Sequence, residues 1–187
     1  MITGSLAAQN ALSFRIITLS AHPWAQTNLP LHQNTLDNNG YITFEPGLIV
    51  AYDRHIKKRF SVNLSTAVFN DCFNSLAGYS QIMLKYNVFK IFKHSLNVGF
   101  GPSVHYEVDK RSLIGYENED KLRFFDNTGY KISWLSGTIE YNYLWSKAVG
   151  FSIALNHIHP RSLALSLGLR FDIPDPNGKG CNCPGYR

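Results

Sequence analysis

The feature that most constrains the fold of this sequence is a repeated alternation of apolar and polar residues. The alternation is clearest in four segments, which are 59–69, 95–108, 149–158 and 162–173. Successive side chains of a β-strand point to opposite faces, so a period of two residues predicts strands. No segment of useful length carries the 3.6-residue period of an amphipathic helix. The pattern therefore predicts an all-β fold.

Four less regular segments complete the predicted set of strands, and they are 11–19, 41–52, 78–88 and 129–143. In 129–143, Ile132 and Trp134 break the phase set by Leu135, which indicates a β-bulge. In 41–52, Pro46 and Gly47 interrupt the pattern, because proline offers no N–H to the sheet. The total is eight strands, each about ten residues long, as in transmembrane barrels.

The connections between these segments alternate in length. The even-numbered connections are all short, and the odd-numbered ones are mostly long, with the longest at 20–40 and 109–128. An antiparallel meander with short turns at one end and long loops at the other is the layout of an outer-membrane barrel. We therefore predict an eight-stranded antiparallel up-and-down transmembrane β-barrel over residues 11–173.

Composition indicates which face of the strands points outward. Only 17% of the 187 residues are charged, below the roughly 25% of soluble domains. The sequence contains no run of about 18 apolar residues, so it predicts no transmembrane helix. The polar face is mostly Ser, Gly, Ala and Asn, which suits the narrow interior of a small barrel better than a soluble surface. Charges on that face are expected to pair inside, and they are Arg15, Glu45, Lys85, Glu107, Glu140 and Arg170.

Aromatic residues gather near the predicted strand ends, where Tyr and Trp favour a membrane interface. Those near the short turns are Tyr52, Phe60, Phe89, Phe92, Tyr143, Trp145 and Phe151. Those near the long loops are Tyr41, Tyr79, Tyr106 and Tyr130. The two groups predict two interfacial belts.

On strand count, alternation and connection lengths, residues 11–173 resemble the small eight-stranded outer-membrane β-barrel proteins. The resemblance implies a Gram-negative outer membrane, periplasmic termini and no open pore. Residues 168–171 resemble the terminal strand of such proteins, although a 14-residue tail follows Ile173. We expect residues 1–10 to be the remnant of a signal peptide or an N-terminal tail, since residues 5–9 have small side chains typical of the end of a signal peptide. Residues 174–187 are expected to form an irregular periplasmic tail with a C-x-C motif.

The segment 156–162 carries the candidate catalytic residues. Within this class of barrels, the lipid A deacylase family uses a His and a Ser two residues apart and an acid on the next strand. Here His159, rather than a serine, stands two residues after His157, and Ser162 lies beyond a proline. The apolar phase of the next strand carries no acid. His157, His159 and Ser162 therefore remain candidate catalytic residues of a lipid A-modifying hydrolase. The alternative is that the two histidines lie at the membrane rim and face lipid headgroups or loops.

We predict no cofactor and no metal site. The C-x-C motif of Cys181 and Cys183 supplies two soft ligands rather than the four of a structural zinc site, and His157 and His159 would need a third ligand such as His22, His32 or His105. The net charge of +5 is scattered, which argues against a nucleic-acid partner. The predicted partners are outer-membrane lipid and a protein contacted through loops 20–40 and 109–128 or the tail.

The leading functional hypothesis is a structural or interaction role as an outer-membrane barrel that presents its loops or tail to partners. Two alternatives stay open. One is the lipid A-modifying hydrolase that uses His157 or His159. The other is a soluble lipid-binding barrel, in which the large aliphatic side chains would face inward.

Overall fold

The structure, a computed structural model, describes residues 10–23, 34–57, 59–72, 74–107, 130–146, 148–158 and 162–173. These residues form eight β-strands: β1 (Asn10–Ala21), β2 (Ile42–Lys57), β3 (Phe60–Asn70), β4 (Leu76–Ile91), β5 (His94–Glu107), β6 (Tyr130–Leu144), β7 (Val149–Ile158) and β8 (Ser162–Ile173). Among the described residues there is no helix long and apolar enough to cross a membrane.

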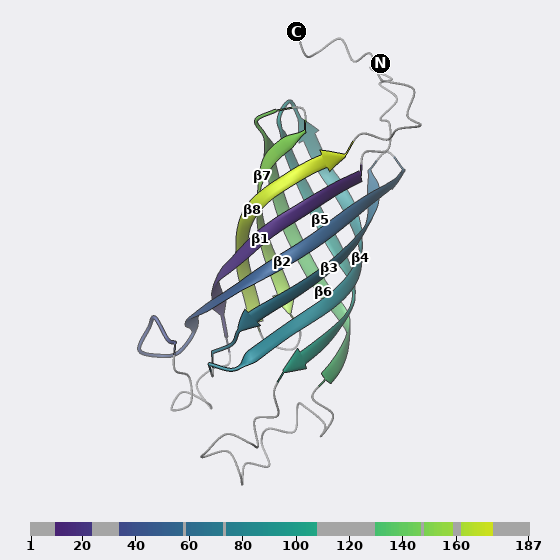
Figure 1. The fold of residues 1–187 in the computed structure, drawn as a ribbon. Coiled ribbons are helices and arrows are strands. Elements are labelled where there is room, and N and C mark those ends of the chain that lie inside the picture. The colour runs from purple at the N-terminus through teal and green to yellow at the C-terminus, as the bar shows by residue number, and fades with distance from the viewer. Residues whose placement is uncertain are drawn as a thin grey trace.

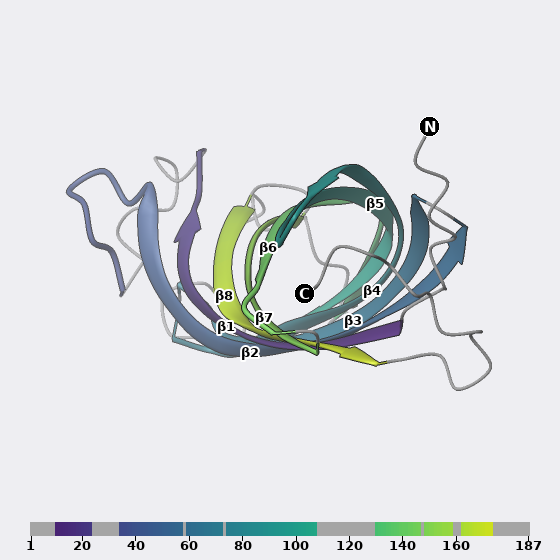
Figure 2. The same cartoon turned by 90° about the horizontal axis from the view of Figure 1, so that it is seen from above.

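The eight strands form one closed antiparallel barrel (Figures 1 and 2). Each strand pairs with its neighbours in the sequence, and β1 closes the barrel against β8, with Asn10 opposite Ile173. The start of β1, the end of β8 and the connections β2–β3, β4–β5 and β6–β7 share one end, which we call the short-turn end. The opposite end, from which the β1–β2 and β5–β6 connections leave, is the long-loop end.

The predicted fold class and all eight predicted strands are confirmed. The strands are longer than predicted at the short-turn end, where β2 runs to Lys57 and β4 to Ile91. The short connections between the predicted strands, 53–58 and 89–94, are therefore shorter still, and Asp53 belongs to a strand. The turn between β4 and β5 contains Phe92 with φ at 51°, so a very short connection is reached through one left-handed residue.

The predicted bulge in the sixth strand is present. Gly101 pairs with Ser136 and Ser103 pairs with Ser133, so β6 carries one more residue than β5 between these pairs. Trp134 and Leu135 consequently both point outward, with 81% and 68% of their surface exposed. The β1–β2 register also shifts opposite Pro46, as the interruption in the sequence indicates.

The large aliphatic and aromatic side chains cover the outside of the barrel. Leu48 and Phe100 are 65% and 60% exposed, whereas Ser13, Ser152 and Ser166 of the opposite phase are fully buried. Such an arrangement suits an environment in which outward apolar surface meets lipid rather than water. It contradicts the alternative of a soluble lipid-binding barrel, because that protein would turn its aliphatic face inward.

One predicted member of the aromatic belts is wrong. Tyr79 is fully buried and packs inside the barrel against Phe69, with ring centroids 6.3 Å apart. Its phase on β4 is that of Gln81 and Met83, which are also buried. Tyr130 and Trp145, by contrast, are exposed near opposite ends of the barrel, as predicted for interfacial residues.

Candidate functional site

The interior near the short-turn end holds a cluster of buried ionic side chains that we call the charged layer. Its members are Arg15, Asp53, Lys85, Glu140, Arg170 and Asp172. They come from β1, β2, β4, β6 and β8, and each points inward because the alternation of its strand requires it. Three cations and three carboxylates meet, so their formal charges cancel.

Glu140 lies at the centre of the charged layer and is fully buried. Its Oε2 accepts hydrogen bonds from Arg15 Nη1 at 2.6 Å and from Lys85 Nζ at 2.8 Å. Its Oε1 accepts from Asn142 Nδ2 at 2.9 Å and lies 3.4 Å from Arg170 Nη1. The Arg15–Glu140 pair joins β1 to β6, two strands that are not neighbours in the barrel. Glu140 therefore connects strands on opposite sides of the barrel through the interior.

Asp53 forms the second centre of the layer. Lys85 Nζ lies 3.0 Å from Asp53 Oδ1, and Arg170 Nη1 lies 2.9 Å from Asp53 Oδ2. Asn63 Nδ2 donates to Asp53 Oδ1 at 2.8 Å. The sequence prediction missed Asp53 because the predicted strand 41–52 ends one residue before it. The inward phase of Ile49 and Ala51, continued by two residues, is the signal that identifies it.

The expectation that inward charges pair is confirmed for the charged layer. Burial of an isolated charge costs several kcal/mol, so each ion inside the barrel requires partners. Arg170 Nε completes the set by donating to Asp172 Oδ1 at 2.9 Å. All six residues are at most 8% exposed. The interior at this level is filled by protein rather than by a water-filled channel.

Toward the long-loop end the interior is filled by small neutral polar side chains, which we call the neutral layer: Ser103, His105, Ser136, Thr138, Asn156 and Ser166. Thr138 Oγ1 donates to Asn156 Oδ1 at 3.1 Å, and Asn156 Nδ2 donates to Ser166 Oγ at 3.1 Å. Ser103 Oγ is 3.0 Å from His105 Nε2. These hydrogen bonds run mainly between neighbouring strands.

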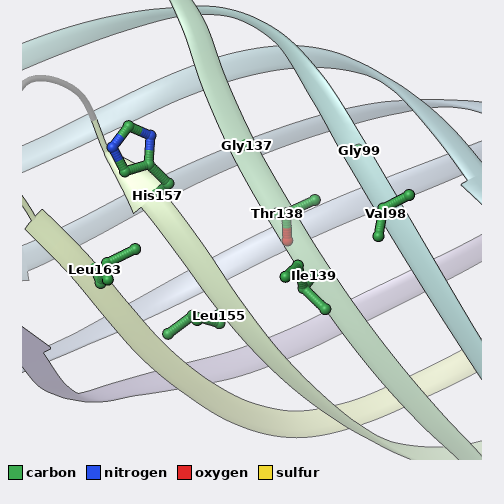
Figure 3. Close-up of a pocket in the computed structure, with 8 residues that line it drawn as sticks. All are labelled: Val98, Gly99, Gly137, Thr138, Ile139, Leu155, His157 and Leu163. Carbon is green, nitrogen blue, oxygen red and sulfur yellow. The ribbon is translucent and has the colours of Figure 1, made fainter.

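The predicted catalytic candidate His157 lies on the outer surface. It stands beside Gly137 and opposite Leu163 on the neighbouring strands. Together with Val98, Ile139 and Leu155 it surrounds a shallow apolar groove of about 260 Å³ (Figure 3). The groove exists because Gly137 has no side chain there. A Cβ at this position would still lie 3.6 Å from its nearest neighbour atom.

The structure does not bring His157 together with Ser162. His157 shares the outward phase of Leu155, whereas Ser162 shares the phase of Ala164 and Ser166, which are buried in the interior. A serine can be activated by a histidine only within hydrogen-bond reach, and these two residues point to opposite faces of the barrel wall. His159 lies outside the described residues.

The proposed combinations of His157 with other histidines are not assembled either. His105 lies inside the barrel, and His22 contacts the inward carboxylate of Glu45. His32, Cys181 and Cys183 lie outside the described residues, as do residues 1–9, loop 109–128, residues 24–33 of loop 20–40 and the C-terminal tail. Among the described residues, the donors close enough to share a metal ion are His22, Glu45 and Cys72.

Comparison with known proteins gives a likeness of fold alone. No protein-family model and no curated protein matches the sequence. Neisserial surface protein A is similar in structure, with a TM-score of 0.56 and 11% identity over 89% of this chain and 99% of that chain. The N-terminal β-barrel domain of Pseudomonas aeruginosa OprF has a TM-score of 0.51 and 8% identity, over 89% of this chain and 100% of that chain. A de novo designed transmembrane β-barrel has a TM-score of 0.51 and 5% identity, over 88% of this chain and 95% of that chain.

The chain has the fold of the small outer-membrane β-barrels. This fold, together with the apolar outer surface of the barrel, places the protein in an outer membrane. A likeness to the lipid A deacylases is not part of this finding.

Proposed function

We propose that the protein is a closed outer-membrane anchor that holds its long loops at the cell surface for a protein partner. The observation that carries this proposal is the charged layer. Its ion pairs cross the interior, so the barrel offers a membrane-embedded support rather than a conduit. A support of this kind acts through the segments that leave it.

The orientation of the anchor follows from the lengths of its connections. Outer-membrane barrels keep short turns on the periplasmic side and long loops outside the cell. The short-turn end connects strands through as few as two residues, between Ile91 and His94, whereas 22 residues separate Glu107 from Tyr130 at the other end. We therefore assign segments 22–41 and 108–129 to the cell surface and both termini to the periplasm.

The segment 108–129 has the composition of a contact region. It combines acidic and basic residues with Tyr116, Phe124 and Phe125. Aromatic residues and arginine, here Arg111 and Arg123, are enriched where proteins meet other proteins. We assign the partner contact to this segment first and to segment 22–41 second.

Photo-crosslinking on intact cells tests the proposal. A photoreactive amino acid at position 116 should give a discrete protein adduct. The same group at position 92, in a short turn, should give no adduct with a protein outside the cell. Replacement of 108–129 by a short linker should abolish the adduct while the barrel still shows heat-modifiable mobility on gels. Absence of an adduct at every position in both long segments would contradict the interaction role.

The hydrolase alternative is tested separately through lipid A. The opposite orientations of His157 and Ser162 argue against these two residues as a catalytic pair. We expect the acylation of lipid A to be the same in cells with and without the protein. Loss of an acyl chain that depends on His157 would replace the anchor proposal with an enzymatic one.

A further inference from the structure

Three side chains with different donor atoms converge inside the barrel at the long-loop end. They are His22, just after β1, Glu45 on β2 and Cys72, just after β3. Their imidazole nitrogen, carboxylate oxygen and thiol sulfur atoms all lie within 4.8 Å of one another. None of the three belongs to the charged layer or to the neutral layer.

We propose that His22, Glu45 and Cys72 form a binding site for a divalent transition-metal ion, with Zn²⁺ as the ion that fits best. Zn²⁺ accepts nitrogen, oxygen and sulfur ligands together, at about 2.0–2.3 Å. Small rotations of the three side chains bring donors that already lie this close onto one ion. Three protein ligands leave the fourth position of a tetrahedral site to water or to an incoming group.

The charges of the donors suit an ion in the barrel interior. Glu45 and Cys72 are buried, at 3% and 4% exposed. One carboxylate and one thiolate together neutralise a divalent cation, so the bound site carries no net charge where charge is costly. On binding, the Cys72 Sγ–H bond breaks, the proton leaves to solvent and an Sγ–Zn bond forms. Nε2 of His22 contributes its lone pair in place of its contact with Glu45.

Hydrogen bonds already hold each ligand or its neighbour in place. The His22 N–H donates to the carbonyl of Tyr41 at 2.7 Å, and Thr43 Oγ1 donates to Glu45 Oε1 at 3.2 Å. Asp71, next to Cys72, accepts hydrogen bonds from the backbone N–H and the hydroxyl of Ser75, both at 2.9 Å. Residues that support metal ligands in this way raise metal affinity.

Access to the site is possible from the long-loop end. The His22 side chain is 18% exposed, against 5% for Glu45, so the imidazole is the ligand nearest the outside. The His22 Nε2–Glu45 Oε1 distance is 2.8 Å, which is a hydrogen bond that a metal ion replaces.

Cobalt(II) titration of the purified full-length protein in detergent tests the site. The experiment uses a C181S/C183S background, which removes the C-x-C motif and leaves Cys72 as the sole cysteine. We expect a thiolate-to-cobalt absorption band that Zn²⁺ displaces. C72S should abolish the band, and H22N and E45Q should weaken affinity by more than the about 10–100-fold that loss of a ligand-supporting residue costs. The control H105N alters a histidine of the same interior and should leave the band unchanged.

A second measurement keeps the test valid if a cluster variant fails to fold. In the C181S/C183S protein, Zn²⁺ should slow the reaction of Cys72 with a maleimide reagent several-fold, and a chelator should restore the rate. T43V should lower cobalt affinity about 10–100-fold while the band keeps its shape. Absence of a cobalt band in the C181S/C183S protein, or a band that persists in C72S, would overturn the proposal.

Discussion

The barrel interior is charged toward the short-turn end and nearly neutral in the layer above it. In the charged layer, Glu140 reaches Arg15 across the interior, and the two residues are 125 positions apart in the sequence. In the neutral layer, Asn156 bonds Thr138 and Ser166 on the two strands beside it. Long ionic side chains therefore connect strands on opposite sides of the barrel, whereas short polar side chains connect neighbouring strands.

The two layers should differ in how well they tolerate substitution. A buried ion that loses one partner leaves the other uncompensated, and the cost is large. A neutral hydrogen bond that is lost costs much less. The charged layer should therefore resist substitution, and the long-loop half of the interior should accept new polar groups. That half is also where His22, Glu45 and Cys72 lie.

The largest expected effect comes from Glu140→Gln. The change removes the charge that three cations share, and we expect a loss of about 3–5 kcal/mol in the free energy of unfolding. Urea unfolding in lipid vesicles measures it. The matched control is Glu45→Gln, which removes an inward carboxylate that contacts His22 and Thr43. An equal loss in both variants would break the contrast between the two halves.

A double-mutant cycle between Arg15→Met and Glu140→Gln isolates the cross-barrel pair. The side chains touch at 2.6 Å, so we expect a coupling free energy of about 0.5–3 kcal/mol. Unfolding of the wild type, both single variants and the double variant under one set of conditions supplies the four values. Additive losses would show that Arg15 and Glu140 do not act as a pair.

A smaller effect is expected from Thr138→Val in the neutral layer. The substitution keeps the side-chain shape and removes one hydrogen bond to Asn156, so the free energy of unfolding should fall by about 0.5–1.5 kcal/mol. The same urea titration measures it. A loss as large as that of Glu140→Gln would mean that the neutral layer also braces the whole barrel.

The smallest expected effect lies outside the membrane-spanning strands, at Asp37. The backbone N–H of Ile42 donates to its carboxylate at 2.7 Å and holds the pKa of Asp37 below its usual 3.8. Because the folded pKa is depressed, the stabilisation is complete above pH 3.8 and is lost as pH falls through the folded pKa. The Ile42 amide chemical shift, followed by NMR in micelles, should titrate below pH 3.8.

Asp37→Asn is the control for this titration and should remove the transition from the Ile42 amide. A transition at or above pH 3.8 in the wild type would contradict the assigned hydrogen bond. This loop charge is held by backbone groups, unlike the charges of the charged layer, which are held by other side chains.

Much of the fold is readable from the sequence, because a period of two residues fixes both the strand and the face of each side chain. The same rule identifies Lys85, Glu140 and Arg170 as inward charges. It also assigns Tyr79 to the interior, and the assignment of Tyr79 to a belt is wrong because it rests on position along the strand rather than on phase. Local periodicity alone therefore predicts the strands and the face to which each side chain points.

The contacts across the interior are not readable in that way. Which cation meets Glu140 depends on barrel closure and on side-chain length, and neither is a local property of the sequence. The cluster of His22, Glu45 and Cys72 has the same origin, since two of its members lie just beyond strand ends whose positions depend on the loops. His157 and Ser162 are only five positions apart in the sequence, yet the alternation of two paired strands turns them to opposite faces.

Planar-bilayer recording of the purified, folded wild-type protein tests most directly the claim that the charged layer closes the barrel. Heat-modifiable mobility of the same sample establishes that the barrel is folded. We expect no unitary current steps beyond those of the bare bilayer, because the ion pairs of Asp53, Glu140 and Arg170 fill the interior. Regular steps from the folded wild-type protein would contradict it and would make the barrel a channel.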